Sequence, residues 1–256
     1  MPAQLPEQLP EPLKVCAVIP AAGKGSRLGI AGPKILTPLN DKETIWSVLH
    51  ARLAPLVDQI HLVLSPEGAQ AFPALPPHVS SSIQPEPIGM GDAIFGAHTF
   101  WEMYDAILIV WGDQVFVSTD TLSRALAVLT VPERRAVLPL TRMADPYVEY
   151  VFENAKLTAV LQSREGDRTT PGGLSDVGTF LLGTRGLTAA WNNYLSKAAH
   201  GRHTGEINFL PFLPFLSDRG WTVTPLEVAD PTEARGINTS EDLSFFRSLY
   251  RYKDAP

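Results

Sequence analysis

Short runs of consecutive apolar residues alternate with amphipathic segments along the first part of the chain. The runs are bounded by polar or turn-forming residues and predict strands at 15–19, 60–64, 106–111 and 135–140, and we expect a shorter strand at 80–84. The intervening segments place apolar residues at helical spacing and predict helices at 43–54, 91–103 and 119–130. Strands that are apolar throughout are buried on both faces, and helices between them favour a parallel sheet. We therefore predict an α/β fold with a mostly parallel central sheet and helices on both faces.

The pattern changes after about residue 141. The sequence there predicts, in order, a β-hairpin (147–152 and 157–161), a polar glycine-rich loop (164–175), a strand (177–182), a helix (188–199), a helical stretch interrupted by Pro211 and Pro214 (207–219), a strand (222–225) and a helix (240–250). We expect a flexible proline-containing arm over 1–13 and one domain over 14–252, with halves 14–140 and 141–252.

Composition narrows the class of protein. Of 256 residues, 45% are hydrophobic and 19% charged, as in a globular protein with a core. A net charge of −6 argues against nucleic-acid binding, which favours clustered basic residues. No apolar stretch reaches the roughly 20 residues of a membrane span, and the N-terminus lacks the apolar core of a signal peptide, so we expect a cytoplasmic protein. The single Cys16 builds no disulfide framework or zinc site.

The loop after the first strand concentrates positive charge. Residues 20–29 read PAAGKGSRLG, and Lys24, Arg27 and Lys34 lie within eleven residues. Ligands of open α/β sheets bind at the carboxyl ends of strands, and glycine-rich turns present N–H groups to anions. The loop lacks the GxxxxGK[ST] of a P-loop, and Leu28 stands where a dinucleotide fingerprint needs glycine. The sequence thus predicts a polyphosphate site, with a solvated flexible loop as the alternative, and disfavours a dinucleotide-dependent oxidoreductase.

Two further elements carry polar side chains suited to a nucleotide. Gln84 offers amide groups that can pair with a pyrimidine edge, and it precedes Gly89 and Gly91 at a predicted helix start. Asp113 follows the strand 106–111, where a carboxylate can hold a hard divalent cation against phosphate oxygens. An ordinary helix start and an ordinary turn residue remain the alternatives for these two segments.

These motifs resemble those of sugar-phosphate nucleotidyltransferases. AAGKGSRLG followed by Pro-Lys is similar to their signature, above all in the uridylyltransferase domain of bifunctional N-acetylglucosamine-1-phosphate uridylyltransferases. The resemblance implies a Rossmann-like nucleotidyltransferase (GT-A-like) fold in which 14–140 binds nucleotide and 141–252, with a small β-rich part, binds the acceptor. It implies catalytic roles for Arg27 and Lys34, and nucleotide contacts from Ala21, Ala22, Gly23, Lys24, Gln84 and Gly89, although Met90 replaces a common Thr.

The resemblance extends to a metal site. Trp-Gly-Asp at 111–113 and Gly-Ile-Asn at 236–238 are similar to family elements whose Asp and Asn bind Mg²⁺, which implies Asp113 and Asn238 as ligands. From its local sequence alone, Asn238 could equally stand beside the N-cap of the helix that begins near Ser240.

The acceptor half matches less closely. Gly-Glu at 205–206 is similar to a family element beneath the sugar, but Tyr147 is followed by Val instead of Gly, Gln162 replaces a Glu, and Asp176 replaces an Asn. The resemblance still implies acceptor contacts from Tyr147, Gln162, Asp176 and Glu206. Because hydrogen bonds built into a site dominate such discrimination, we expect a different acceptor.

The predicted activity is Mg²⁺-dependent condensation of an NTP, most favourably UTP, with a sugar 1-phosphate to give an NDP-sugar and pyrophosphate. The alternatives are a CTP-dependent cytidylyltransferase acting on another phosphorylated small molecule, and a non-catalytic nucleotide-sensing protein with the same fold.

Overall fold

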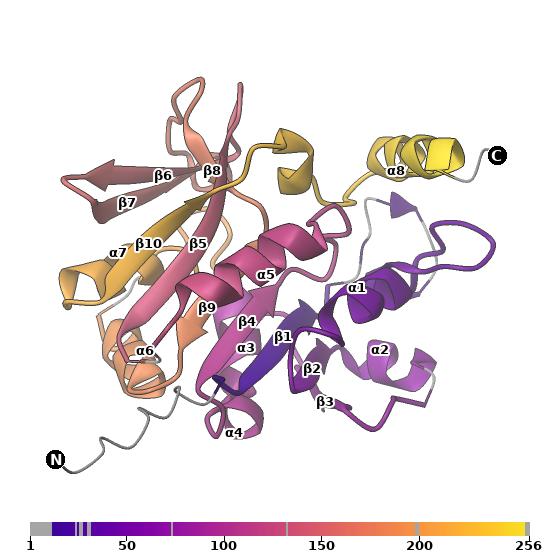
Figure 1. Cartoon of the computed structure of the whole chain (residues 1–256), viewed down its shortest axis with the longest axis horizontal. Coiled ribbons are helices and arrows are strands. Elements are labelled where there is room, and N and C mark those ends of the chain that lie inside the picture. The colour runs from indigo at the N-terminus through magenta and orange to yellow at the C-terminus, as the bar shows by residue number, and fades with distance from the viewer. Residues whose placement is uncertain are drawn as a thin grey trace, which may run out of the picture.

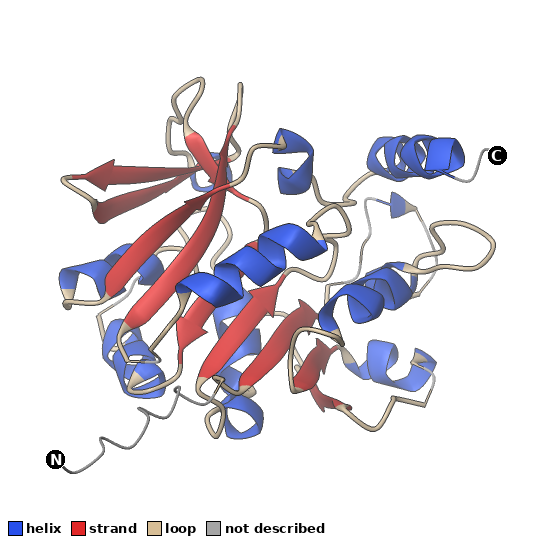
Figure 2. Ribbon diagram, viewed as in Figure 1, coloured by secondary structure: helices blue, strands red, loops and turns tan. Residues whose placement is uncertain are grey.

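A twisted central sheet runs through the molecule, with helices on both of its faces (Figures 1 and 2). The computed structural model describes residues 12–253 apart from positions 24, 26–27, 30–31, 73, 132 and 198–199. The path of strands across the sheet is β10-β5-β9-β4-β1-β2-β3, and β8 pairs with β5. These strands are β1 (Val15–Ala21), β2 (Gln59–Leu64), β3 (Val79–Ile83), β4 (Ala106–Val110), β5 (Arg135–Arg142), β8 (Leu174–Asp176), β9 (Thr179–Gly183) and β10 (Thr222–Glu227). This is the α/β fold expected from the sequence.

The central strands are buried because each contributes to a core on either face. Along β1, Val15, Ala17 and Ile19 join one apolar cluster, whereas Cys16 and Val18 join the other. The first cluster is covered by the helices α1 (Ile45–Leu53), α5 (Thr119–Val128) and α8 (Ser240–Lys253). The second is covered by α3 (Met90–Gly96), α4 (His98–Trp101), α6 (Leu187–Leu195) and α7 (Phe212–Asp218).

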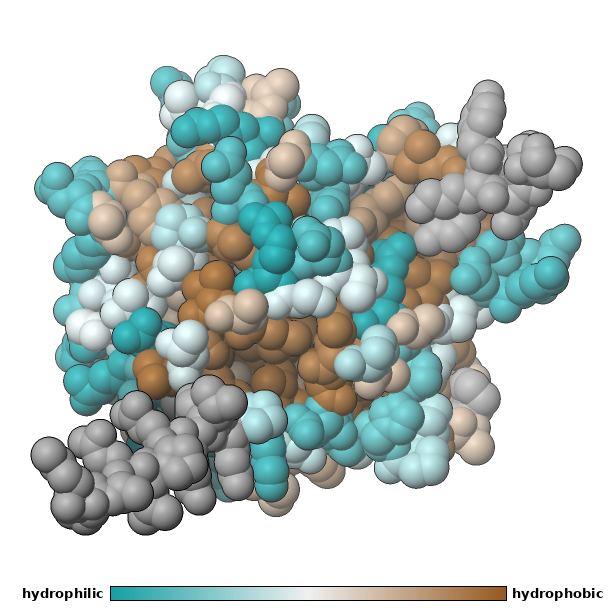
Figure 3. Space-filling view, viewed as in Figure 1, coloured by the Kyte–Doolittle hydropathy of each residue, from teal (hydrophilic) through white to brown (hydrophobic). Residues whose placement is uncertain are grey.

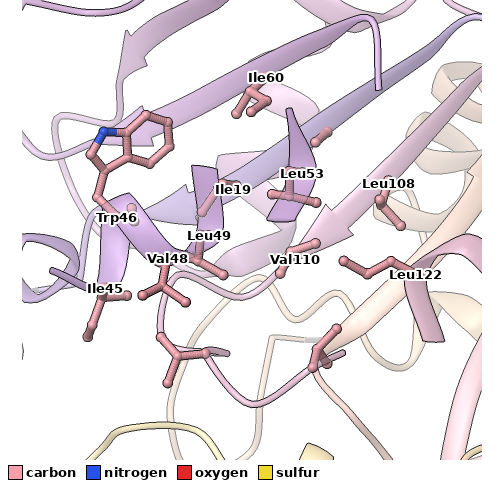
Figure 4. Close-up of a cluster of buried hydrophobic side chains, with 14 of the residues drawn as sticks. Ile19, Ile45, Trp46, Val48, Leu49, Leu53, Ile60, Leu108, Val110 and Leu122 are labelled. Atoms are coloured by element: carbon pink, nitrogen blue, oxygen red, sulfur yellow. The ribbon is translucent and has the colours of Figure 1, made fainter. Parts of the chain in front are cut away.

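Helix α1 shows how one such layer is built. Thr44 caps it by accepting a hydrogen bond from the Ser47 N–H, and the Ser47 hydroxyl accepts from the Thr44 N–H in return. Its apolar face, including Val48 and Leu49, then points toward the side chains of β1 and β4 (Figure 4). Burying side chains of this size contributes about 1.5–3 kcal/mol each, so the helix is held mainly by its packing.

The direction in which successive strands are added to the sheet reverses at β1. From β1 the chain proceeds outward through β2 and β3, with parallel pairing throughout, and then returns to place β4 parallel to β1 on its other side. Such a switch point leaves a crevice at the carboxyl ends of the two strands, where ligands of α/β proteins bind. The loops after Ala21 and Val110 come together at this end of the sheet, where Gly112 lies against Pro20.

The second half of the chain extends the same sheet. Strand β9 pairs antiparallel with both β4 and β5, and β10 pairs parallel with β5. The predicted hairpin forms a separate two-stranded sheet of β6 (Val148–Glu153) and β7 (Lys156–Gln162), seen at the upper left of Figure 1. Its turn residues Asn154 and Ala155 adopt positive φ, as tight hairpin turns require.

Several predicted boundaries are wrong. The helix expected at 91–103 divides at Ala97 into α3 and α4, and the loop expected at 164–175 contains the start of β8. Pro211 and Pro214 do not interrupt α7, because they occupy its N-cap and first turn, where backbone N–H groups need no helical acceptor. The short α2 (Pro66–Ala71) was not predicted.

The view of Figure 3 shows apolar residues gathered below α5, over β4 and β1, with hydrophilic residues around them. Among the helices formed by the described residues, none combines the length and the apolar character that a membrane crossing requires.

Candidate active site

The loops after β1 and β4 approach so closely that glycine is needed between them. A Cβ built on Gly112 would lie 2.9 Å from the carbonyl oxygen of Pro20 and 3.3 Å from the Ala21 side chain. The backbone of this turn is therefore held against the strand that precedes the glycine-rich loop. The carboxylate of the next residue, Asp113, projects at the switch point, as its place after a central strand predicts.

Lys34 reaches the same point from a short 3-10 turn, η2 (Lys34–Leu36). The Thr37 N–H donates to the Lys34 carbonyl, and the next side chain, Ile35, is anchored in the core with 1% exposure. Gly25, at φ +60°, passes against the lysine stem, where an added Cβ would lie 2.9 Å from the Lys34 Cβ. The base of the side chain is thus held in place, while the long stem carries the ammonium toward β4.

Three residues distant in sequence meet through that ammonium. Lys34 Nζ donates to Asp113 Oδ2 at 2.6 Å and to Asn238 Oδ1 at 2.8 Å. The Lys34 and Asp113 side chains are only 17% and 20% exposed, so water screens their charges less than at an open surface. The structure therefore brings together Lys34 and the two residues expected to bind metal.

The segment that carries Asn238 is fastened to the Asp113 loop along its length. The Ile237 N–H donates to the Asp113 carbonyl at 3.0 Å, and buried Gln114 donates through its amide nitrogen to the Glu233 carbonyl at 2.5 Å. The Glu233 carboxylate in turn accepts from the Ser118 N–H at 3.0 Å. Gly236 has no room for a side chain without crowding Asp113 and Asn238, since its Cβ would lie 3.1 Å from both.

The start of α8 holds Asn238 from the other side. Asp242 Oδ2 accepts from the backbone N–H groups of Asn238 and Thr239, and Thr239 Oγ1 accepts from the Asp242 N–H. Burial alone would raise the pKa of Asp242, but hydrogen bonds from Arg235, Asn238 and Thr239 hold this pKa below its ordinary value. Thr239 and Asp242 form the helix cap, which leaves the Asn238 side chain for the site.

The segment expected to read the base is folded onto itself. Gln84 is buried, and its amide nitrogen donates to the Gly89 carbonyl at 3.1 Å and to Asp92 Oδ2 at 2.7 Å. Gly89 adopts φ +137°, and a Cβ there would lie 2.4 Å from the Ile207 carbonyl oxygen. The two predicted residues therefore lie together, and these hydrogen bonds use the donors of Gln84 while its carbonyl oxygen takes no part in them.

The four predicted acceptor residues have different surroundings. Tyr147 is 60% exposed, whereas Gln162 is buried and accepts from the Asn208 amide at 2.9 Å. Glu206 forms an ion pair with Arg164. Both the Gln162 and the Glu206 contacts are made within the protein, so a ligand meeting them would meet preformed pairs.

Asp176 is the fourth of these residues, and it lies near the loop that carries Asp113. Its carboxylate accepts from the Tyr150 hydroxyl at 3.0 Å and from the Gly178 N–H at 2.8 Å, while the Gly178 carbonyl accepts from the Trp111 N–H. Burial raises the pKa of Asp176, and the Asp113 carboxylate adds to the increase despite these hydrogen bonds. Asp176 therefore supports the turn that presents Asp113.

The glycine-rich loop is described in part. Ala21 and Ala22 are buried at the end of β1, and no atom of the described residues lies within 4 Å of the place where a Gly23 Cβ would stand. The predicted residues Lys24 and Arg27 lie outside the described residues. The space above Gly23 leaves the backbone accessible to a ligand.

Sequence reasoning missed the residues that assemble the site. Gly112 and Gly236 lie inside the two motifs of the expected metal site and Gln114 follows the first of them, but their closeness to other segments is a tertiary property. Asp242 could have been found, because Thr239-Ser-Glu-Asp242 matches the pattern of a capping box. Glu233 carried no local signal.

The donor atoms at this point suit a hard divalent cation. Asp113 Oδ2 and Asn238 Oδ1 already converge on one positive group, and Mg²⁺ takes oxygen ligands, commonly one or two from the protein with the remainder from phosphates and water. Within the described part of the chain, no group of three or more His, Cys, Asp or Glu residues could hold a metal by itself.

Comparison with known proteins identifies the family and the fold. A family model described as the MobA-like NTP transferase domain matches residues 17–177, which span β1 to the loop before β9. The fold is similar to that of a Bacillus anthracis protein assigned as a glucose-1-phosphate thymidylyltransferase, whose crystal structure is in complex with sucrose. The two chains share 17% identity with a TM-score of 0.70, covering 94% of this chain and 96% of that one.

Proposed function

Because the chain belongs to the MobA-like NTP transferase domain family, we propose that it joins the nucleoside monophosphate part of an NTP to a sugar 1-phosphate and releases pyrophosphate. The observation that carries this proposal is the meeting of Lys34, Asp113 and Asn238 at the switch point of the sheet. A cationic side chain and two oxygen ligands are the groups that charge neutralisation of a polyphosphate requires.

The reaction is an in-line displacement. An oxygen of the acceptor phosphate attacks the α-phosphorus, a new P–O bond forms, and the bond to the β-phosphate oxygen breaks with departure of pyrophosphate. The acceptor phosphate is already an anion, so positioning and electrostatic stabilisation replace a general base. Asp113 and Asn238 would hold Mg²⁺, which would neutralise charge on the α-phosphate and the acceptor phosphate.

The cationic side chains act on the phosphates of the nucleotide. Lys34 approaches them from η2, and we assign Arg27, with Lys24, to the leaving pyrophosphate. The exposed backbone at Gly23, after buried Ala21 and Ala22, offers the close approach that a phosphate needs. Each charge removed from such a site typically slows the reaction about 10²–10³-fold.

The preferred nucleotide is UTP. Gln84 and Gly89 lie together at the start of α3, and with the Gln84 donors engaged by Gly89 and Asp92, its carbonyl oxygen is the atom left to accept from a base N–H. Thymine presents the same pairing edge as uracil, so the thymidylyltransferase assignment of the structural neighbour is compatible with a pyrimidine. CTP remains the second candidate.

The acceptor binds between β6–β7 and the segment around residue 206. We assign its contacts to Tyr147, Gln162 and Glu206, with Asp176 behind the metal-site turn. Because Gln162 is already paired with Asn208 and Glu206 with Arg164, this part of the site presents polar groups that already have partners in the protein. Such pairs discriminate strongly among hydroxyl patterns, which makes the acceptor the most specific part of the reaction.

The test is pyrophosphate release, measured with UTP, CTP, dTTP, ATP and GTP against a panel of sugar 1-phosphates. We expect one pyrimidine nucleotide to support turnover, and Asp113→Asn to lower that rate about 10²–10³-fold. The matched control is Asp120→Asn on α5, whose side chain is 78% exposed and which should retain the rate. Nucleotide binding without turnover for any pair would identify a sensor, and full activity of Asp113→Asn would contradict the mechanism.

A further inference from the structure

The ammonium of Lys34 occupies the position that the two metal ligands define. Its distances to Asp113 Oδ2 and Asn238 Oδ1, 2.6 and 2.8 Å, leave no space for a second cation between those oxygens. An ammonium and a divalent ion this close together, in a partly buried site, would also repel strongly. The two oxygens can therefore serve Lys34 or a metal ion, but not both at once.

The lysine is built so that only its outer part needs to move. Its backbone is held by the 3-10 turn, by buried Ile35 and by the contact of Gly25 with its Cβ. Beyond that point the side chain is a flexible four-carbon stem carrying a compact charge, which can rotate to another anion without any change in the fold. A phosphate above the glycine-rich loop would be such an anion.

We propose that Lys34 is an exchangeable counter-ion that keeps the metal site closed until nucleotide binds. In the nucleotide-free protein its ammonium holds Asp113 and Asn238 together, and the cation enters when nucleotide phosphates give the ammonium a new partner. This inference rests on the proposed function and deepens it. It requires that metal and nucleotide bind with positive coupling, each raising the affinity for the other by the same factor.

The exchange lowers the affinity of the free protein for metal alone. When a competent state is populated only in part, the apparent dissociation constant rises by the inverse of that fraction. Replacing Lys34 by Met keeps the apolar stem against Gly25 but removes the charge that competes for the two oxygens. The variant should therefore bind a metal ion more tightly than the native protein does, although it has lost a residue of the site.

The experiment is a Mn²⁺ titration of nucleotide-free protein, followed by the electron paramagnetic resonance signal of the free ion. We expect Lys34→Met to bind Mn²⁺ about tenfold or more tightly than the native chain, as for an open state populated at about a tenth or less. Lys42→Met, at an exposed position, is the matched control and should leave the affinity unchanged. Adding Asn238→Ala to Lys34→Met should abolish the gain in Mn²⁺ affinity. That loss would show that the ion binds at Asn238.

Each outcome separates the exchange from the proposed function. If Lys34→Met binds Mn²⁺ no more tightly than the native protein, the exchange is wrong. Tight joint binding of Mn²⁺ and a non-hydrolysable UTP analogue to the native protein would then still support nucleotide transfer. If Lys34→Met gains Mn²⁺ affinity while the native protein binds no nucleotide, Lys34 competes with the cation as inferred, but its release by nucleotide and the proposed function both fail.

Discussion

Gly89 is a residue at which the first half of the chain has no room for a side chain. Its φ of +137° is a conformation that residues with a Cβ rarely adopt, and an added Cβ would lie 2.4 Å from the Ile207 carbonyl oxygen. The obstacle is backbone, held in place because the Gly91 N–H donates to that oxygen and the Ile207 N–H donates to the Ile88 carbonyl. The loop can therefore relieve the clash only by breaking these hydrogen bonds.

Gly89→Ala should consequently destabilise the protein by at least about 2 kcal/mol, from backbone strain and overpacking together. Gly96→Ala is the matched control at the other end of α3, where nothing lies within 4 Å of the added Cβ. That substitution should be neutral or stabilising by up to about 1 kcal/mol, because alanine favours helix more than glycine does. Urea denaturation of both variants measures the difference in stability. Equal midpoints would show that the loop accommodates the Cβ without loss of stability, which would contradict the prediction.

At the residue scale, the sequence predicted that Lys34, Asp113 and Asn238 would lie together, but it did not predict the other contacts of the expected site residues. The type and position of Lys34 and Asp113 were sufficient to expect a site, since a basic loop after one strand and a carboxylate after another must meet at a switch point. The pairing of Gln162 with Asn208 could not be predicted, because residues 46 positions apart become neighbours only through the packing of β7. The same holds for the Gln84 donors, which engage Asp92 instead of facing outward.

Among the elements, the segment from η4 (Pro231–Ala234) to the first turn of α8 connects the end of the chain to the Asp113 loop. Asp242 anchors it by accepting from the N–H groups of Asn238 and Thr239 and from Arg235. Losing these charge-assisted hydrogen bonds in Asp242→Asn should cost about 1–3 kcal/mol at neutral pH. Glu241→Gln, at the exposed neighbouring position, should cost little.

The contribution of Asp242 should also depend on pH in a defined direction. Its pKa in the folded protein lies below the ordinary value of 3.8. The stabilisation is therefore complete above that value and is lost as pH falls through the folded-state pKa. Denaturation midpoints of the native protein and Asp242→Asn, measured from about pH 7 down to about pH 3, should differ by a constant amount and then converge. A difference that grows on acidification would contradict the lowered pKa of Asp242.

Element boundaries were less predictable than element types. The signal for α2 was present, since Ser65 caps it by accepting from the Gly68 N–H and Pro66 opens it, but its six residues are too few to show a helical period. The effect of the two prolines near α7 was wrongly predicted. Proline breaks a helix when it lies in the helix interior, but it is tolerated at the N-cap and in the first turn, where these prolines lie. In both cases a local signal existed, and only the three-dimensional context decided its meaning.

For the whole molecule, the sequence predicted the class of fold but not the order and direction of all its strands. Apolar runs indicate buried strands without giving their direction, so the antiparallel insertion of β9 between β4 and β5 could not be expected. That insertion joins both halves of the chain in one sheet and brings Gly178 against Trp111 beside the turn that carries Asp113. Opening the sheet at this point would separate the proposed acceptor contacts from the proposed nucleotide contacts.

Cys16 can report on the integrity of that sheet. It is the only cysteine of the chain, lies in β1 with strands on both sides and has 0% exposure. Burial, and then the charge of Asp58, raises the pKa of its thiol to about 12, so the folded protein presents almost no thiolate. Because β1 is paired with β2 and β4, we expect the thiol to become reactive only when the whole sheet opens.

Thiol labelling of the native protein in increasing urea should therefore give an opening free energy equal to the global unfolding free energy, with the same dependence on urea. Nucleotide with Mg²⁺ should slow labelling by the factor that mass action predicts, because only the folded state would bind them. Labelling that is fast and independent of urea would mean that β1 separates from its neighbours by a local motion. The crevice at its carboxyl end could not then be the rigid platform that positioning of a polyphosphate requires.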